Sequence, residues 1–157
     1  MRVGIGYDIH PLKAGRDLIL GGVRIAHAVG LDGHSDADVL THAVIDALFG
    51  AAALGDIGTF FPATDEKWKA ASSLDLLRIA AGTVTKAGFR IVNVDSTVIA
   101  EEPRLESHLR AMKINLGDCL GIAPAAVGVK ATSPEGLGAL GRQGGIAAQA
   151  VALIEET

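Results

Sequence analysis

Hydrophobic and polar positions alternate at the start of the chain, which predicts a strand over residues 3–7. This strand ends in a polar group that contains Asp8 and His10, and Pro11 prevents a helix from following. Because strand side chains alternate with a period of two, Asp8 and His10 are expected on the same side. The opening segment therefore presents a carboxylate and an imidazole together at a strand end.

Farther along, the pattern predicts a mixture of helices and strands. The expected elements are a hairpin of residues 18–20 and 23–25 around Gly21 and Gly22, helices over 36–53, 72–87 and 104–120, strands over 91–100 and 127–131, and glycine-rich loops over 54–64 and 133–145. Ser35 or Asp36 is expected to cap the first helix, and Pro103 to begin the third. Residues 146–154 are compatible with either a helix or a strand. With no internal repeat or linker, the fold class is α/β with a small mixed sheet.

Composition limits the size and type of the core. The chain has 157 residues, enough for one domain, and it is 49% hydrophobic but only 4% aromatic, so the core is built from small and aliphatic side chains. An apolar fraction this high in a short chain suggests that other subunits cover part of its surface.

Charge and cysteine content exclude several classes of protein. The net charge of −4, with no cluster of Lys and Arg, argues against a protein that binds nucleic acid or anionic membranes through a basic surface. Cys119 is the only cysteine and the N-terminus lacks a signal-peptide pattern, so we expect a cytoplasmic protein. No apolar run is long enough to span a bilayer.

The strongest chemical signal is a polar stripe on the apolar helix expected over residues 36–53. Almost every residue there is hydrophobic, so the helix is expected to be buried nearly all round. Asp38, His42 and Asp46 nevertheless recur every four residues and lie along one face. Unpaired carboxylates and an imidazole are costly in apolar surroundings, so something must neutralise them.

A bound metal ion is one way to neutralise these polar side chains. His42, together with Asp8 and His10, would supply three nitrogen and oxygen ligands and leave a fourth position open, the pattern of catalytic zinc. Asp38 or Asp46 could orient His42 from behind. On residues alone the alternative stays open: His42 is an ordinary core histidine and Asp8 a turn residue.

Two weaker patterns have competing readings. Gly4 and Gly6 hint at a dinucleotide-binding loop, but no third glycine follows at the needed offset, and we reject that reading. Ser133, Glu135 and Arg142 could form a site for phosphate and a cation, or simply an ordinary polar loop.

Seven ordered motifs, spread over nearly the whole chain, resemble the cyclodiphosphate synthase family. They are D-I-H at 8–10, H-S-D-A-D at 34–38, T-H at 41–42, G-D-I-G at 55–58, F-P-A-T-D at 61–65, K-A-T-S-P-E at 130–135 and G-R at 141–142. The resemblance implies one domain over residues 1–157, with a four-stranded mixed sheet, helices on one face, and sheets that pack around the threefold axis of a homotrimer. Residues 146–154 would then be a strand, and active sites would lie between subunits.

The resemblance also implies roles for individual residues. Asp8, His10 and His42 would bind Zn²⁺, and Glu135 a second divalent ion, Mg²⁺ or Mn²⁺, at the substrate diphosphate. His34 and Ser133 would stabilise the transition state. The implied substrate contacts are Asp8, Ile9, His10, His34, Ser35, Asp56, Ile57, Gly58, Phe61, Pro62, Ala63, Thr64, Asp65, Ala100, Glu101, Glu102, Pro103, Arg104, Leu105, Glu106, Ala131, Thr132, Ser133, Pro134, Glu135, Ala139 and Arg142.

The reaction implied by the resemblance converts 4-diphosphocytidyl-2-C-methyl-D-erythritol 2-phosphate to 2-C-methyl-D-erythritol 2,4-cyclodiphosphate and CMP, in the non-mevalonate isoprenoid pathway. Ala63 replaces a common Asp and removes one expected hydrogen bond to the substrate. The resemblance also implies that residues 100–106 and 131–133 of a neighbouring subunit line the cytidine pocket, which Glu106 and Pro134 alter. Ala139 and Gly144 replace a bulky aromatic and an acid near the threefold channel.

Two other functions are compatible with these residues. A metal-dependent phosphohydrolase would use the same ligands with water as the nucleophile, and would release inorganic phosphate instead of CMP. A non-catalytic trimer that binds isoprenoid diphosphates is the other alternative, although the complete set of catalytic motifs, Ala139 and Gly144 count against it.

Overall fold

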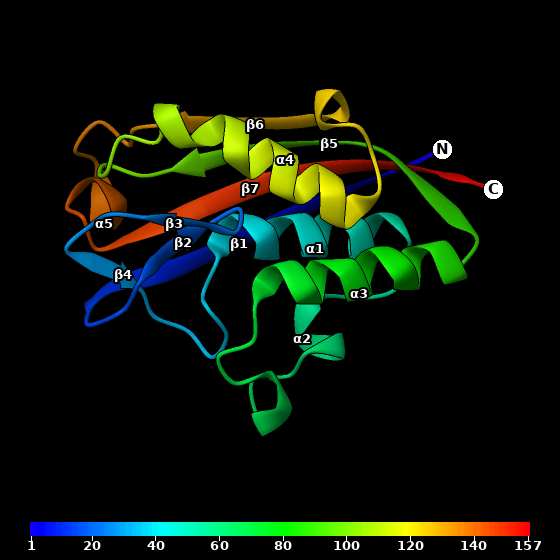
Figure 1. The fold of residues 1–157 in the computed structure, drawn as a ribbon, viewed down its shortest axis with the longest axis horizontal. Helices are drawn as coiled ribbons and strands as arrows, with labels where there is room; N and C mark the ends of the chain where they lie inside the picture. The colour runs from blue at the N-terminus through cyan, green and yellow to red at the C-terminus, as the bar shows by residue number, and fades with distance from the viewer.

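Five strands form a mixed sheet in the computed structural model, which describes residues 1–157 (Figure 1). In spatial order they are β4 (Val29–Leu31), β1 (Arg2–Ala14), β7 (Gly145–Glu156), β5 (Phe89–Ile99) and β6 (Val127–Thr132). β5 and β6 run parallel, and the other neighbours are antiparallel. The four longer strands are the predicted sheet, and the three-residue β4 adds a fifth at the edge by pairing with the end of β1.

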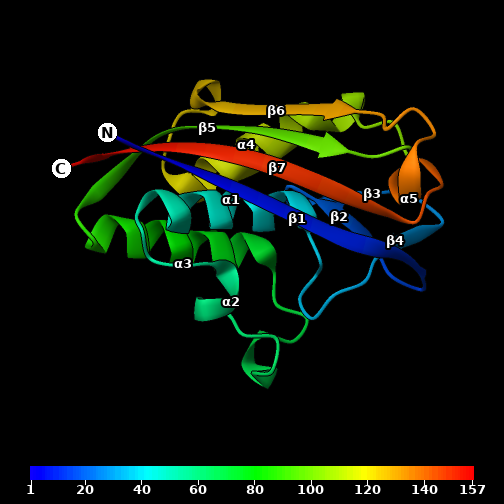
Figure 2. The same ribbon diagram turned by 180° about the vertical axis from the view of Figure 1, so that it is seen from behind.

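Helices cover one face of this sheet and leave the other bare (Figure 2). The three long helices are α1 (Val39–Ala51), α3 (Ser73–Lys86) and α4 (Leu109–Leu120). The short elements are the hairpin β2 (Leu18–Leu20) and β3 (Val23–Ile25), the helices α2 (Ile57–Phe60) and α5 (Gly138–Gly141), and the 3-10 turns η1 (Glu66–Trp68), η2 (Glu106–His108) and η3 (Pro124–Ala126). No helix combines the length and the apolar character that a membrane crossing requires.

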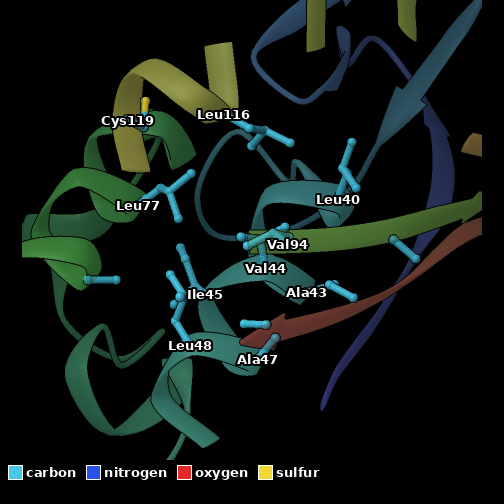
Figure 3. Close-up of a cluster of buried hydrophobic side chains, with 14 of the residues drawn as sticks. Leu40, Ala43, Val44, Ile45, Ala47, Leu48, Leu77, Val94, Leu116 and Cys119 are labelled. Atoms are coloured by element: carbon cyan, nitrogen blue, oxygen red, sulfur yellow. The ribbon is translucent and has the colours of Figure 1, made fainter. Parts of the chain in front are cut away.

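The core is centred on α1, which packs against the sheet on one side and α3 on the other (Figure 3). The prediction that this helix is buried nearly all round is confirmed. On the sheet side it approaches β1 so closely that a Cβ at Gly4 or Gly6 would collide with the carbonyl oxygens of Ala47 or Ala43. Glycine in β1 and alanine in α1 therefore set the distance between strand and helix. This close packing, and not a dinucleotide-binding loop, explains Gly4 and Gly6.

The bare face of the sheet carries an apolar strip. Val3, Ile5, Tyr7 and Ile9 alternate along β1, and each has about half or more of its surface exposed, with values of 66%, 70%, 49% and 48%. Val151 of β7, the cross-strand partner of Ile5, extends the strip. The intervening positions of β1 face α1, so the period-two pattern predicted for this strand holds.

Several predicted boundaries were wrong. β1 continues to Ala14, so Asp8 and His10 lie inside the strand and not at its end. α1 begins at Val39, and Asp38 caps it instead of Ser35 or Asp36 by accepting from the Thr41 amide. The third helix begins at Leu109, because the chain first turns to bury Leu105 and then forms η2. The alanine-rich tail is the central strand β7, as the family resemblance implied.

Candidate metal centre and substrate cavity

Asp8 and His10 from β1 meet His42 from α1, as the sequence predicted. Asp8 Oδ2 lies 2.9 Å from His42 Nδ1 and 3.0 Å from His10 Nε2, and the two ring nitrogens are 3.3 Å apart. The three side chains are only 25%, 21% and 11% exposed. No other His, Cys, Asp and Glu residues form a comparable candidate metal site.

The donor atoms fit a tetrahedral metal ion. Zinc bonds of about 2.0–2.1 Å to nitrogen and oxygen place neighbouring ligand atoms about 3.3 Å apart, close to the distances found here. His10 Nδ1 lies 2.8 Å from the Asp32 carbonyl oxygen, which can only accept, so Nδ1 carries the proton and Nε2 of the neutral ring offers a lone pair. A carboxylate oxygen and a ring lone pair facing each other favour a cation between them.

The ionisation of the triad agrees with this geometry. Burial disfavours the charged form of Asp8, but its hydrogen bonds to His10 and His42 and their positive charges hold its pKa well below the usual value. Burial likewise opposes a charge on His10, yet the neighbouring Asp8 carboxylate raises the pKa of His10 above its ordinary value. In the absence of a metal, protons on the histidine rings supply part of the positive charge that stabilises the Asp8 carboxylate.

Two hydroxyl groups hold the far side of the His42 ring. His42 Nε2 lies 2.9 Å from Ser73 Oγ and 3.1 Å from Ser35 Oγ. The prediction that Asp38 or Asp46 orients His42 from behind was wrong, because neither carboxylate is a hydrogen-bond partner of the ring. Ser73 was not predicted, since it lies 31 residues away on α3 and nothing in its local sequence marks it.

Asp38 instead ties the β2–β3 hairpin to α1. Its fully buried carboxylate accepts from the Gly21 and Gly22 amides at 2.9 and 2.8 Å, and from the amide and hydroxyl of Thr41 at 3.0 and 2.7 Å. Complete burial raises the pKa of Asp38, which the Thr41 and Gly22 hydrogen bonds counteract. Asp38 therefore compensates its burial cost with backbone donors, without a metal.

A cavity of about 220 Å³ opens beside the triad. It brings together predicted site residues from four separate segments of the chain, and adds two that were not predicted, Trp68 and Leu76. The lining residues are Asp8, His10, His34, Ser35, His42, Ile57, Gly58, Phe61, Ala63, Trp68 and Leu76. His34 Nε2 lies 3.0 Å from the Asp65 carbonyl oxygen, which links the loop before α1 to the predicted substrate contacts at residues 61–65.

Two further side chains, neither of them a predicted substrate contact, hold these loops in place. Arg16 donates to the carbonyl oxygens of Leu31, Gly33 and Ser35 at 3.0, 3.1 and 2.9 Å, which shapes the loop before α1. Asp46 accepts from the Ile57 amide at 2.7 Å and so anchors the start of α2 to α1.

The predicted substrate contacts at residues 61–65 are anchored by an aromatic contact. Phe61 is buried and packs edge-on against Trp68, with ring centroids 5.0 Å apart. Asp56 is exposed and caps α2 through the amide and hydroxyl of Thr59, both at 2.8 Å. These hydrogen bonds lower the pKa of Asp56.

A second cavity of about 500 Å³ collects the residues predicted to contact cytidine except Glu102, and it adds Leu109, which was not predicted. Its lining is Ala100, Glu101, Pro103, Arg104, Leu105, Glu106, Leu109, Ala131, Thr132 and Ser133, none of which lines the first cavity. Glu101 organises this region, since Oε2 accepts from Ser133 Oγ at 3.0 Å and from the Gly136 amide at 3.1 Å. Ser133 Oγ in turn accepts from the Glu135 amide at 2.9 Å.

The remaining predicted contacts line neither cavity. They are Ile9, Asp56, Pro62, Thr64, Asp65, Glu102, Pro134, Glu135, Ala139 and Arg142. Within one chain, Ser133 is therefore not gathered with His34, its predicted catalytic partner, into one cavity. The predicted site therefore forms two cavities, one lined by residues between 8 and 76 and the other by residues between 100 and 133.

Comparison with known proteins identifies the family. The model of the YgbB family matches residues 1–155. The chain belongs to this family. A YgbB relative from Syntrophomonas wolfei, named 2-C-methyl-D-erythritol 2,4-cyclodiphosphate synthase, is 58% identical over 156 residues and 99% of each chain is covered. A Synechocystis relative of the same name is 55% identical, with 98% of this chain and 96% of the relative covered.

Solved structures of YgbB relatives have the same fold. The bifunctional IspDF from Campylobacter jejuni aligns with a TM-score of 0.96 at 40% identity, and the match covers 99% of this chain and 42% of that one. IspF from Plasmodium falciparum, in a complex with CDP, aligns with a TM-score of 0.87 at 34% identity, covering 99% of this chain and 96% of that one. The resemblance inferred from the motifs is confirmed.

Proposed function

We propose that this YgbB protein cyclises 4-diphosphocytidyl-2-C-methyl-D-erythritol 2-phosphate to 2-C-methyl-D-erythritol 2,4-cyclodiphosphate and releases CMP. The observation that carries the proposal is the convergence of Asp8, His10 and His42 at a cavity lined by the family motifs. The names of relatives more than 50% identical over nearly the whole chain support it. Residues 1–157 would form one cyclodiphosphate synthase domain, and the cytoplasmic location stays a prediction.

The proposed cofactors are Zn²⁺ on Asp8, His10 and His42, and Mg²⁺ or Mn²⁺ on Glu135 with the substrate diphosphate. Bound cations would polarise phosphoryl oxygens and offset the negative charge that builds up during transfer. In the reaction an oxygen of the 2-phosphate attacks the β-phosphorus, the bond from that phosphorus to the CMP oxygen breaks, and CMP leaves. No protein nucleophile takes part.

The chain's own contribution is positioning. Two phosphate groups of one substrate repel each other, so holding them in line is the main task. His34 and Ser35 line the triad cavity and are suited to donate hydrogen bonds to phosphate oxygens. The Gly58 region and Phe61 would enclose the methylerythritol part and keep water from the reacting phosphorus.

We further propose a homotrimer with active sites between subunits. The two cavities share no lining residue, so the cytidine cavity of one subunit would complete the triad cavity of its neighbour, and Ser133 would then meet His34 across the interface. The exposed strip of Ile5, Tyr7 and Val151 gives the sheet an apolar face for such packing. The CDP complex of the Plasmodium falciparum relative supports a cytidine nucleotide site.

The test is to incubate the protein with the proposed substrate and Mg²⁺ and to follow CMP by chromatography. We expect CMP and the cyclic diphosphate in equal amounts from the parent, and a loss of at least about a thousandfold in rate for His42→Ala. His27→Ala is the matched control, since His27 lies outside both cavities, and it should retain the parent rate. Inorganic phosphate in place of CMP would indicate a phosphohydrolase and contradict the proposal.

A further inference from the structure

We propose that Asp36 and Ser73 are positioning residues that fix the His42 ring with its proton on Nε2, so that Nδ1 presents a lone pair to the metal. Asp36 precedes α1 and Ser73 is the first residue of α3. Neither residue belongs to the predicted ligand set. The inference rests on the metal site proposed above and adds what holds one of its ligands in the binding form.

The direction of the hydrogen bonds follows from the Asp36 carboxylate, which can only accept. Oδ2 accepts from the Ser73 amide at 2.9 Å, and Oδ1 accepts from the Ser73 hydroxyl and from the Asp38 amide, the latter at 3.2 Å. The single hydrogen of the Ser73 hydroxyl therefore points at Asp36. Only lone pairs of Ser73 Oγ remain for the imidazole.

The imidazole must accordingly be the donor. Ser73 Oγ lies 2.9 Å from His42 Nε2, a contact that is favourable only if Nε2 carries a proton. In the neutral ring that binds a metal, the other nitrogen, Nδ1, is then unprotonated, and Nδ1 faces Asp8 and His10. Without a metal, a second proton on Nδ1 can instead bond the Asp8 carboxylate 2.9 Å away. Asp36 and Ser73 thus select the tautomer of His42, as the Asp32 carbonyl does for His10.

Burial protects these hydrogen bonds from competition with water. Ser73 is fully buried, and Ser35 and His42 are only 7% and 9% exposed, so water cannot readily replace the bonds. The protonated Nε2 cannot accept from Ser35, whose Oγ also accepts from the Ala37 amide at 3.2 Å. The hydroxyl hydrogen of Ser35 is therefore left to point into the cavity, where a phosphate oxygen could accept it.

The first test uses the parent protein without metal. Nitrogen-15 NMR of the histidine rings reports which nitrogens of His42 carry a proton. We expect a proton on Nε2, whether or not a second proton on Nδ1 bonds the Asp8 carboxylate. A His42 ring without a proton on Nε2 would overturn the proposal, and this measurement requires neither a variant nor a metal, so it is separate from the test of the proposed function.

The second test removes the Ser73 hydroxyl. Ser73→Ala keeps the amide that bonds Asp36, so the start of α3 is preserved, while His42 Nε2 is left with Ser35 alone. We expect zinc affinity, measured by competition with a chelator, to fall about 10–100-fold, and the ring to become a mixture of tautomers.

Ser72→Ala is the matched control, because Ser72 caps α3 without a side-chain hydrogen bond, and it should bind zinc like the parent. Circular dichroism checks that both variants are folded. If folded Ser73→Ala bound zinc within twofold of the parent and kept the Nε2 proton, Asp36 and Ser73 would have no positioning role. If Ser73→Ala did not fold, the NMR result on the parent would decide.

Discussion

Replacing Gly6 by alanine should damage both the stability of the protein and its metal site. Gly6 lies in β1, and an added Cβ would collide with the Ala43 carbonyl oxygen and approach the Ala47 amide nitrogen to 2.7 Å. Both neighbours are backbone atoms of α1, so no side chain can rotate away. The helix as a whole must move from the strand by more than about 1 Å to restore ordinary contact distances.

The size of the effect follows from two opposing contributions. Forcing extra volume into a packed core costs about 1–3 kcal/mol, and a clash with the backbone of a buried helix belongs at the upper end. Alanine gains back less than about 1 kcal/mol by restricting the unfolded chain. We therefore expect a net loss of about 2 kcal/mol. Because His42 moves with α1 while Asp8 and His10 stay on β1, zinc affinity should fall at least about tenfold.

The assay is urea unfolding at one fixed protein concentration with a chelator, followed by a zinc competition titration of the folded variant. Gly82→Ala is the control, since Gly82 lies in the exposed part of α3 with nothing within 4 Å of an added Cβ, and it should stabilise the helix by about 0.5–1 kcal/mol. A Gly6→Ala protein as stable as the parent, with parent zinc affinity, would refute the argument that these glycines set the helix–strand distance.

Three further predictions concern other parts of the molecule. Asp38→Asn would turn an amide group toward backbone donors, so urea unfolding should show a loss of about 1–3 kcal/mol; parent stability would mean that the four bonds to this carboxylate do not matter. Ile5→Lys should convert the proposed trimer to monomers in sedimentation experiments, and a persistent trimer would place the interface elsewhere. Because the pKa of Asp8 is lowered from 3.8, its contribution to the stability of the metal-free protein is present above that value and lost as the pH falls through the folded-state pKa. Acid unfolding of the metal-free parent should therefore be steeper below about pH 4 than that of Asp8→Asn, and identical profiles would contradict the shift.

The triad could be predicted from the sequence because each part of it is encoded locally. Period-two alternation puts Asp8 and His10 on one side of a strand whatever its length, and an imidazole on an otherwise apolar helix needs a partner. The strand's length could not be predicted. Pro11 looks like an end signal, yet it lies where β1 stops pairing with β7 and the following residues pair with β4 instead.

Contacts between distant segments account for most of what was missed. The hydroxyl behind His42 comes from α3, and the donors to Asp38 come from the β2–β3 hairpin, so only the folded chain reveals them. The tail was ambiguous because alanine favours helices. Its buried alanines, including Ala148, Ala150 and Ala152, occur in a strand because β7 is the middle strand of the sheet and packs closely under α1.

The proposed function depends on the binding of one divalent ion by Asp8, His10 and His42. The most direct measurement is anomalous diffraction at the zinc absorption edge from crystals grown with Zn²⁺. We expect a single strong peak in each subunit, about 2.0–2.2 Å from Asp8 Oδ2, His10 Nε2 and His42 Nδ1. Well-ordered density for the three side chains with no anomalous peak between them would contradict this expectation.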